Sequence, residues 1–291
     1  MPATDAADEG DVTNLGGSVG RTGDRRRRTL RGRVGAVIAA LMCSFVMIGG
    51  AGQTPAAATG TPYPCKATGG SNGDASAIGW LGNGHGATAC LGGSFYVPNG
   101  IDQSYGFGVY NNSATTWTNA QGYLPALVTG FKEGQARVTI TNFGDQVTLG
   151  GHSYVLIYSR VSVTNPTWRP VTVDPQPSSG LTALNTASTT VAPHGTVNHD
   201  YVVAADRFGA TYAWPTTEQL AAAGGYDQHF GHMKRFWDGQ LSKLASPQLP
   251  DRKLVDAYRA GFIYTQINRS GNALNIPHAD VNELLSYTLA A

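Results

Sequence analysis

The hydrophobic pattern of this chain changes its period once, near Trp214, and that change constrains the fold more than any other feature. Before it, segment 136–143 alternates apolar residues such as Val138 and Ile140 with polar ones, the period of two expected of a β-strand. After it, apolar residues recur three and four positions apart, the period of one helix face: Tyr226, Phe230, Met233, Trp237, Leu241 and Leu244. The sequence therefore predicts strands followed by helices.

The first part reads as a mainly β fold. Strands are predicted over 94–97, 105–110, 136–143, 152–166, 169–175 and 196–206. Turn residues separate these runs at Gly144-Asp145, Gly150-Gly151, Asn165-Pro166 and Pro193-His194-Gly195. Many short strands without intervening helices predict an antiparallel β-sandwich domain over residues 93–214.

The last part, residues 215–291, reads as a helical segment. Helices are predicted over 216–225, from Tyr226 to a break at Pro247, and from Asp251 to Ser270. The tail could add one short helix from Asp280. Exposed apolar faces on the two long helices, 237–244 and 262–267, would favour self-association.

The N-terminal residues 1–58 read as a disordered start and a signal peptide. Four arginines, Arg25 to Arg28, precede an apolar stretch from Val34 to Ala51 and a small-residue site ending at Ala58. This order predicts secretion with cleavage near Ala58, so contact with the membrane would be transient. A retained membrane anchor is the alternative.

Export changes the reading of the three cysteines. Cys43 lies inside the signal, which leaves Cys65 and Cys90 as a pair in an oxidising compartment. They bound most of a glycine-rich segment, 59–92, and we expect a disulfide between them; two free thiols are the alternative. The segment lacks the Lys-Ser/Thr of a phosphate-binding loop, so we expect no nucleotide and no other cofactor there.

Charge and histidine spacing exclude two further classes of protein. The formal net charge is +1, and only 13% of residues are charged, which gives no electrostatic footprint for nucleic acid. His229 and His232 are three positions apart with no Glu between them, unlike a zinc-protease helix, so we expect no metal site. They flank the predicted buried face and read as histidines at the edge of a packed helix.

The acidic residues beside those histidines do not form a catalytic pair. Asp227 and Asp238 share a helix face but stand about 16 Å apart at 1.5 Å per residue. The carboxyl groups of inverting glycosidases are only about 6.5–9.5 Å apart.

The phrases "VTVDPQPSSGL", "HDYVVAADRFG" and "LPDRKLVDAYRAGFIYTQI" together resemble the front half of a secreted bacterial six-hairpin glycosidase. The resemblance implies a supersandwich-like β-domain leading into an (α/α)₆ toroid, and inverting hydrolysis of O-glycosidic bonds in an oligo- or polysaccharide. This chain carries only the first helices of such a toroid and looks truncated. The family's catalytic carboxylates have no counterpart here, so no catalytic residue is assigned.

Two functions remain open from the sequence. One is the front part of a glycoside hydrolase that lacks the catalytic residues. The other is a non-catalytic secreted β-sandwich that binds carbohydrate or a protein partner. Four tryptophans beside predicted loops could stack on a sugar ring, or fill the core instead: Trp80, Trp117, Trp168 and Trp214.

Overall fold

The centre of the fold is a long antiparallel hairpin of β7 (Ala136–Leu149) and β8 (His152–Thr164). Successive side chains of a strand point to opposite faces, so Ile140 and Phe143 on β7 lie on different sides of the sheet. Both are buried. A hairpin buried on both faces needs a covering layer on each side.

This computed structural model describes Cys65 and residues 75–83, 86–98, 101–109, 115–270 and 273–274. All of them belong to one compact unit, Gln53–Ala291. The predicted signal peptide and the predicted helix from Asp280 lie outside the described residues.

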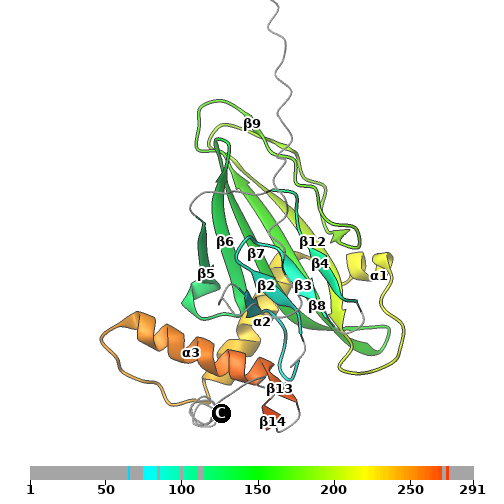
Figure 1. The fold of residues 1–291 in the computed structure, drawn as a ribbon, viewed down its shortest axis with the longest axis vertical. Coiled ribbons are helices and arrows are strands. Elements are labelled where there is room, and N and C mark those ends of the chain that lie inside the picture. Colours follow the sequence, from blue (N-terminus) through cyan, green and yellow to red (C-terminus); the bar gives the residue numbers. More distant parts are fainter. Residues whose placement is uncertain are drawn as a thin grey trace, which may run out of the picture. The chain divides into compact units, whose positions relative to one another are not determined.

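The hairpin forms the middle of a six-stranded antiparallel sheet in the order β10-β12-β8-β7-β6-β5 (Figure 1). The other strands are β5 (Thr116–Asn119), β6 (Ala126–Glu133), β10 (Thr182–Ala183) and β12 (Thr196–Asp206). A single 3₁₀ turn, η1 (Ala120–Gly122), joins β5 to β6.

A second antiparallel sheet lies against one face of the first. It runs in the order β1-β2-β3-β4, with β1 at Ala75–Ala77, β2 at Thr88–Cys90, β3 at Phe95–Val97 and β4 at Gln103–Tyr105. The Asn142 amide donates to the Gly93 carbonyl at 2.8 Å, and the Thr129 hydroxyl donates to the Leu91 carbonyl at 3.1 Å. These side-chain bonds fix the small sheet to β6 and β7.

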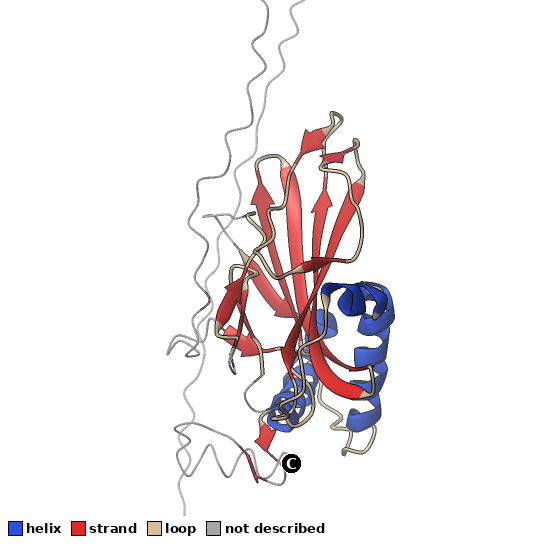
Figure 2. Ribbon diagram, turned by 90° about the vertical axis from the view of Figure 1, so that its right-hand side faces the viewer, coloured by secondary structure: helices blue, strands red, loops and turns tan. Residues whose placement is uncertain are grey.

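Three α-helices follow within the described residues. Figure 2 shows the first two on the opposite side of the large sheet from the small one, and Figure 1 shows the third at the lower end of the sheets. They are α1 (Thr217–Ala222), α2 (Tyr226–Leu241) and α3 (Arg252–Ile267). A capping box at Thr216 starts α1, and the Asp251 carboxylate caps α3. Helix α2 buries Met233 and Trp237 completely.

Two short strand pairs complete the described structure. One joins β9 (Val171–Thr172) to β11 (Thr190–Val191), and the other joins β13 (Arg269–Ser270) to β14 (Ala273–Leu274). The prediction of a mainly β chain with antiparallel sheets is thus confirmed. No helix in the described part of the chain has the length and apolar character needed to cross a membrane.

The predicted turn at Gly144-Asp145 is wrong, because β7 continues through both residues. Gly144 lies against the Ile78 carbonyl, where a Cβ would come within 2.1 Å of the oxygen. Asp145 is fully buried and binds side chains of α2. Gly144 and Asp145 therefore serve contacts with other segments of the chain, and the chain does not turn at them.

Three other expectations also need correction. The described part of segment 59–92 contains β1 and β2, which at three residues each are too short to show a period. Of the described residues 105–109 in the predicted run 105–110, only Tyr105 belongs to a strand, because the Phe107 carbonyl instead accepts from the Gln176 backbone. In the run 169–175, only Val171–Thr172 is a strand.

The helix faces expected to be exposed are largely covered. Trp237, Phe262 and Ile267 are all buried, because the helices pack against the sheets and each other. The large apolar side chains that are exposed near α3 are Leu249, Leu254 and Tyr258.

Candidate functional site

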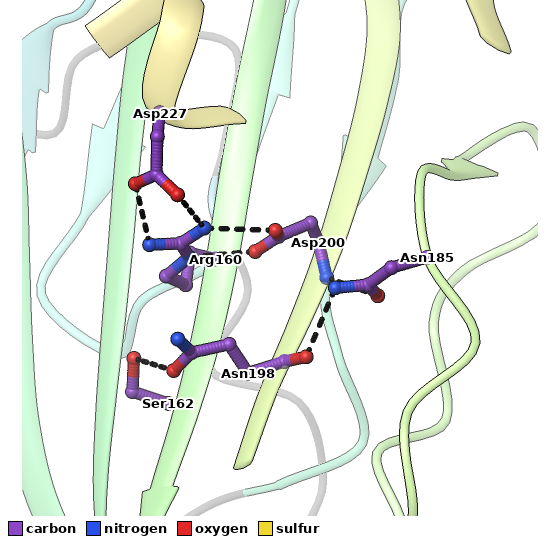
Figure 3. Close-up of polar contacts among 6 residues, drawn as sticks. All are labelled: Arg160, Ser162, Asn185, Asn198, Asp200 and Asp227. Atoms are coloured by element: carbon purple, nitrogen blue, oxygen red, sulfur yellow. Dashed lines mark hydrogen bonds and ion pairs between the residues drawn. The ribbon is translucent and has the colours of Figure 1, made fainter. Parts of the chain in front are cut away.

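The N-terminus of α2 is attached to the sheet through Arg160 on β8 (Figure 3). The Arg160 guanidinium donates to both oxygens of Asp200 on β12, at 2.7 and 2.9 Å. It also donates to both oxygens of Asp227 in the first turn of α2, at 2.8 and 3.0 Å. The hydrogen bonds with Asp200, followed by those with Asp227, raise the pKa of Arg160 against the effect of its partial burial. The guanidinium carbon lies 4.0 Å from the centre of the Tyr226 ring, which adds a cation–π contact.

We call the contacts of Arg160 with Asp200 and Asp227 the Arg160 junction. Next to the Arg160 junction, the same face of the sheet carries polar side chains. Cross-strand partners on this face are Thr139, Ser162 and Asn198 in one row, and Arg137, Thr164 and Thr196 in the next. Each of the six side chains is exposed or half-buried. We call these six residues the polar face. Figure 2 shows that the helices cover only part of the sheet on this side.

Hydrogen bonds hold much of the polar face in one arrangement. The Ser162 hydroxyl donates to the Asn198 side-chain oxygen at 2.8 Å, and the hydroxyls of Thr164 and Thr196 are 2.9 Å apart. At the sheet edge, the Asn185 amide donates to the Asn198 carbonyl at 3.1 Å. Figure 3 shows the side-chain nitrogen of Asn198 without a partner among the residues drawn. The face therefore presents ordered hydroxyl, amide and guanidinium groups to solvent.

Further along α2, two histidines bind one buried carboxylate. Nδ1 of His229 lies 2.7 Å from an Asp145 oxygen, and Nδ1 of His232 lies 2.8 Å from the other. Asp145 is fully buried and His229 is 6% exposed, whereas half of the His232 side chain is exposed. The Tyr158 ring stacks on His229 at 4.2 Å.

His229 has an acceptor at each ring nitrogen. Its Nε2 lies 3.0 Å from the Ala223 carbonyl, which can only accept a hydrogen bond. The Asp145 carboxylate lies at its Nδ1. The cluster therefore joins α2, β7 and the end of α1 through side-chain contacts of His229. Among the described residues, no group of three or more His, Cys, Asp and Glu side chains is placed to hold a metal ion.

At the other end of α2, Asp238 makes two further contacts. It accepts a hydrogen bond of 2.6 Å from the Tyr123 hydroxyl and forms an ion pair with Lys234. Burial acts to raise the pKa of Asp238, but the hydrogen bonds from Lys234 and Tyr123 outweigh it and lower that pKa. Burial and the bond to Asp238 raise the pKa of Tyr123. Asp227 and Asp238 thus serve different junctions, and the structure does not bring them together.

The four predicted sugar-stacking tryptophans do not meet at one site. Trp80 is buried, with Phe236 stacked on it at 4.1 Å and His232 at 5.7 Å, so its ring has no open face. Trp117 on β5 and Trp214 are partly buried against the core. Trp214 also carries the Arg207 guanidinium 4.3 Å from its ring centre. Only Trp168 offers a broad surface, being 85% exposed with its ring set edge-on to His194.

The expected cysteine pair is joined in the structure. A disulfide links Cys65 to Cys90, with their Cα atoms 5.6 Å apart. The two half-cystines and Tyr96 form a small buried cluster of their own. The bridge ties the chain before β1 to the end of β2.

Sequence reasoning missed Asp145, Arg160 and Asp200 as site residues. Arg160 and Asp200 each lie in a strand that was predicted. Pairing those two strands in an antiparallel register would have placed the two side chains side by side on one face of the sheet. No family model, no curated protein and no solved structure matches this chain.

Proposed function

We propose that this chain is a non-catalytic part of a secreted glycoside hydrolase and that it binds oligo- or polysaccharide on the polar face. In this proposal the two antiparallel sheets form a β-sandwich, and α2 and α3 are the first helices of an (α/α)₆ domain. The resemblance of the sequence to six-hairpin glycosidases and the order of sheets before helices support it.

The proposed absence of catalysis rests on how the described carboxylates are used. Glycoside cleavage needs two carboxyl groups on either side of the scissile bond, with room for a sugar between them. Asp200 and Asp227 come together, but the Arg160 guanidinium fills the space between them and binds both. Five of the other described carboxylates, those of Asp102, Asp145, Asp206, Asp238 and Asp251, each accept hydrogen bonds from their surroundings.

The observation that carries the binding proposal is the row Thr139, Ser162 and Asn198. Register places these side chains side by side on adjacent strands, and none lies under a helix deeply enough to be buried. Hydroxyl and amide groups both donate and accept, as sugar hydroxyls do. Because a rigid sheet holds them, little side-chain entropy remains to be lost when a ligand binds.

Arg137, in the next row of the polar face, could contact a ligand longer than one sugar ring. It is exposed on β7, next to Thr164 across the hairpin, and its side chain forms no hydrogen bond within the described residues. A guanidinium carries five donors in a fixed plane, which suits adjacent hydroxyl oxygens. A chain of sugars lying along the polar face would meet donors and acceptors from three strands.

Retention of the purified chain on a panel of immobilised plant, fungal and bacterial polysaccharides tests the binding proposal. The double variant Thr139→Val, Asn198→Ala removes three polar groups and should weaken binding about tenfold or more, at ~1 kcal/mol per hydrogen bond. Thr148→Val is the matched control, since Thr148 is exposed on the same strand but points to the opposite face. Binding to no member of the panel, or equal loss in both variants, would refute the proposal.

Assays with chromogenic α- and β-glycosides test the catalytic half of the proposal. We expect no turnover above that of buffer. Turnover that disappears when an Asp or Glu of this chain is substituted would show that the chain is itself an enzyme.

A further inference from the structure

A polar cleft of about 350 Å³ opens between the C-terminal end of α2, the connection to α3, and α3 itself. In Figure 1 this connection leads from α2 to the orange helix α3. Six side chains supply its chemistry: Tyr123, Asp238, Ser242, Ser246, Tyr258 and Arg259. None of them belongs to the polar face.

Asp238 gives the cleft an anchored carboxylate. Its contacts with Tyr123 and Lys234 fix its orientation, yet 39% of the side chain is exposed. A carboxylate has about four acceptor positions, so two contacts leave others available. This group can accept hydrogen bonds from a ligand without rearrangement.

Arg259 gives the cleft a guanidinium with unused donors. Its only described ion pair, with Asp256, spans 3.9 Å, which is too long for a hydrogen bond. Its guanidinium carbon lies 5.4 Å from the centre of the Tyr123 ring, which holds the group near the cleft wall. Gly122 allows this packing, because a Cβ there would come within 2.7 Å of the Asp256 carboxylate.

The combined chemistry restricts the ligand. Asp238 is paired with Lys234, and Arg259 lies near Asp256, so the charges at and beside the cleft sum to zero, which favours a neutral ligand over an anion or a cation. Serine and tyrosine hydroxyls add further donors and acceptors, which disfavours an apolar ligand. Tyr258, 37% exposed, offers an aromatic ring against which a flat array of C–H groups can pack.

We propose that this cleft binds one neutral pyranose unit, with hydroxyls shared between Asp238 and Arg259 and a ring face against Tyr258. The volume is near the lower end of the ~300–1,000 Å³ typical of small-molecule sites, which suits a single sugar ring. The site does not rest on the polar face and would exist even if no polysaccharide bound there.

Titration of the full chain with the methyl glycosides of glucose, galactose, mannose and xylose, followed by saturation-transfer NMR, tests this proposal. Glucuronate serves as the charged counterpart of the same ring. We expect at least one neutral glycoside to bind with a millimolar or lower Kd, and more tightly than glucuronate. No binding by any of the four, or preference for glucuronate, would overturn the proposal.

Variants then place the ligand in the cleft. Tyr258→Ala should weaken binding roughly threefold to tenfold through the lost ring contact. Arg259→Gln should weaken it about tenfold through the lost charged donors. Leu254→Ala is the control, because Leu254 is 56% exposed on the same helix but does not line the cleft.

Tyr258 and Leu254 are both exposed, so neither variant should alter folding, and unfolding curves would verify this. Equal affinity in Tyr258→Ala and Leu254→Ala would exclude the cleft as the site. The Thr139→Val, Asn198→Ala variant should leave monosaccharide affinity unchanged. Its effect on polysaccharide retention therefore separates failure of the polar face from failure of the cleft.

Discussion

Asp145 on β7 accepts a hydrogen bond of 2.7 Å from Nδ1 of His229 on α2, a residue 84 positions further along the chain. The carboxylate is fully buried, and the imidazole almost so. Burying polar groups in this way costs free energy unless they are hydrogen-bonded. This pair therefore determines where α2 lies on the sheet.

The first prediction concerns this pair. Asp145→Ala leaves the His229 ring buried without its carboxylate, and we expect the free energy of unfolding to fall by about 3–5 kcal/mol. His232→Gln removes the partner whose side chain is half exposed, and should cost about 1 kcal/mol or less. Urea denaturation measures both. Similar losses in the two variants would mean that the buried pair does not fix the helix.

Much of the fold could be predicted because the spacing of apolar residues distinguishes strands from helices. The strands β7, β8 and β12 and the helices α2 and α3 each have an apolar face long enough to repeat several times. The three-residue strands β1 and β2 contain less than two repeats, and neither was predicted. Strand β6 is eight residues long and was not predicted either, because Gly130 and Lys132-Glu133 interrupt its apolar pattern.

The candidate sites were harder to predict for a different physical reason. Gly144-Asp145 has the composition of a turn, but its role depends on a carbonyl from Ile78 and on two histidines of α2. Trp80 is a residue type that often stacks on sugar rings, but the Phe236 ring covers it. In each case the deciding contact comes from a distant segment, which no local pattern contains.

The second prediction compares the same substitution, glycine to alanine, at two positions. Gly144→Ala would place a methyl group 2.1 Å from the Ile78 carbonyl oxygen, so the backbone must shift, and we expect a loss of about 1–3 kcal/mol or more. Gly239→Ala in α2 meets nothing within 4 Å and should stabilise the protein by about 0.5–1 kcal/mol, because Ala favours a helix. Thermal unfolding should therefore shift Tm down in one variant and up in the other. A shift of the same sign in both would contradict the close approach of β7 to Ile78.

The third prediction concerns the Arg160 junction. Arg160→Met leaves Asp200, whose side chain is only 10% exposed, without its charged donors, and should cost about 1.5–3 kcal/mol. Asp227→Asn removes the other partner, which is 81% exposed, and should cost at most about 1 kcal/mol. Chemical denaturation at low and high salt distinguishes them, since only the effect at Asp227 should shrink as salt screens it. A larger loss at Asp227 than at Arg160 would rule out this arrangement.

The last prediction concerns pH and His199 on β12. Burial lowers the pKa of His199 in the folded protein, although Asp174 and Asp200 act in the opposite direction. Its Nε2 is also buried without a hydrogen-bond partner in the described part of the chain. Folding therefore favours the neutral ring, whereas the unfolded chain takes up a proton near the ordinary histidine pKa of about 6.5.

The sign of the effect follows from proton linkage. Below about pH 6.5 the unfolded state binds more protons at this position than the folded state, so stability falls as pH decreases. His199 should therefore contribute a drop in the unfolding free energy between pH 7.5 and pH 5, so stability should fall less steeply, or rise more steeply, over this range in His199→Phe, which cannot titrate at this position. Val203→Ala, a buried apolar change on the same strand, should lower stability by a similar amount at every pH and leave the slope unchanged. Urea denaturation at four or five pH values gives the slopes, and an identical slope in His199→Phe and the unsubstituted chain would show that His199 is not the group responsible.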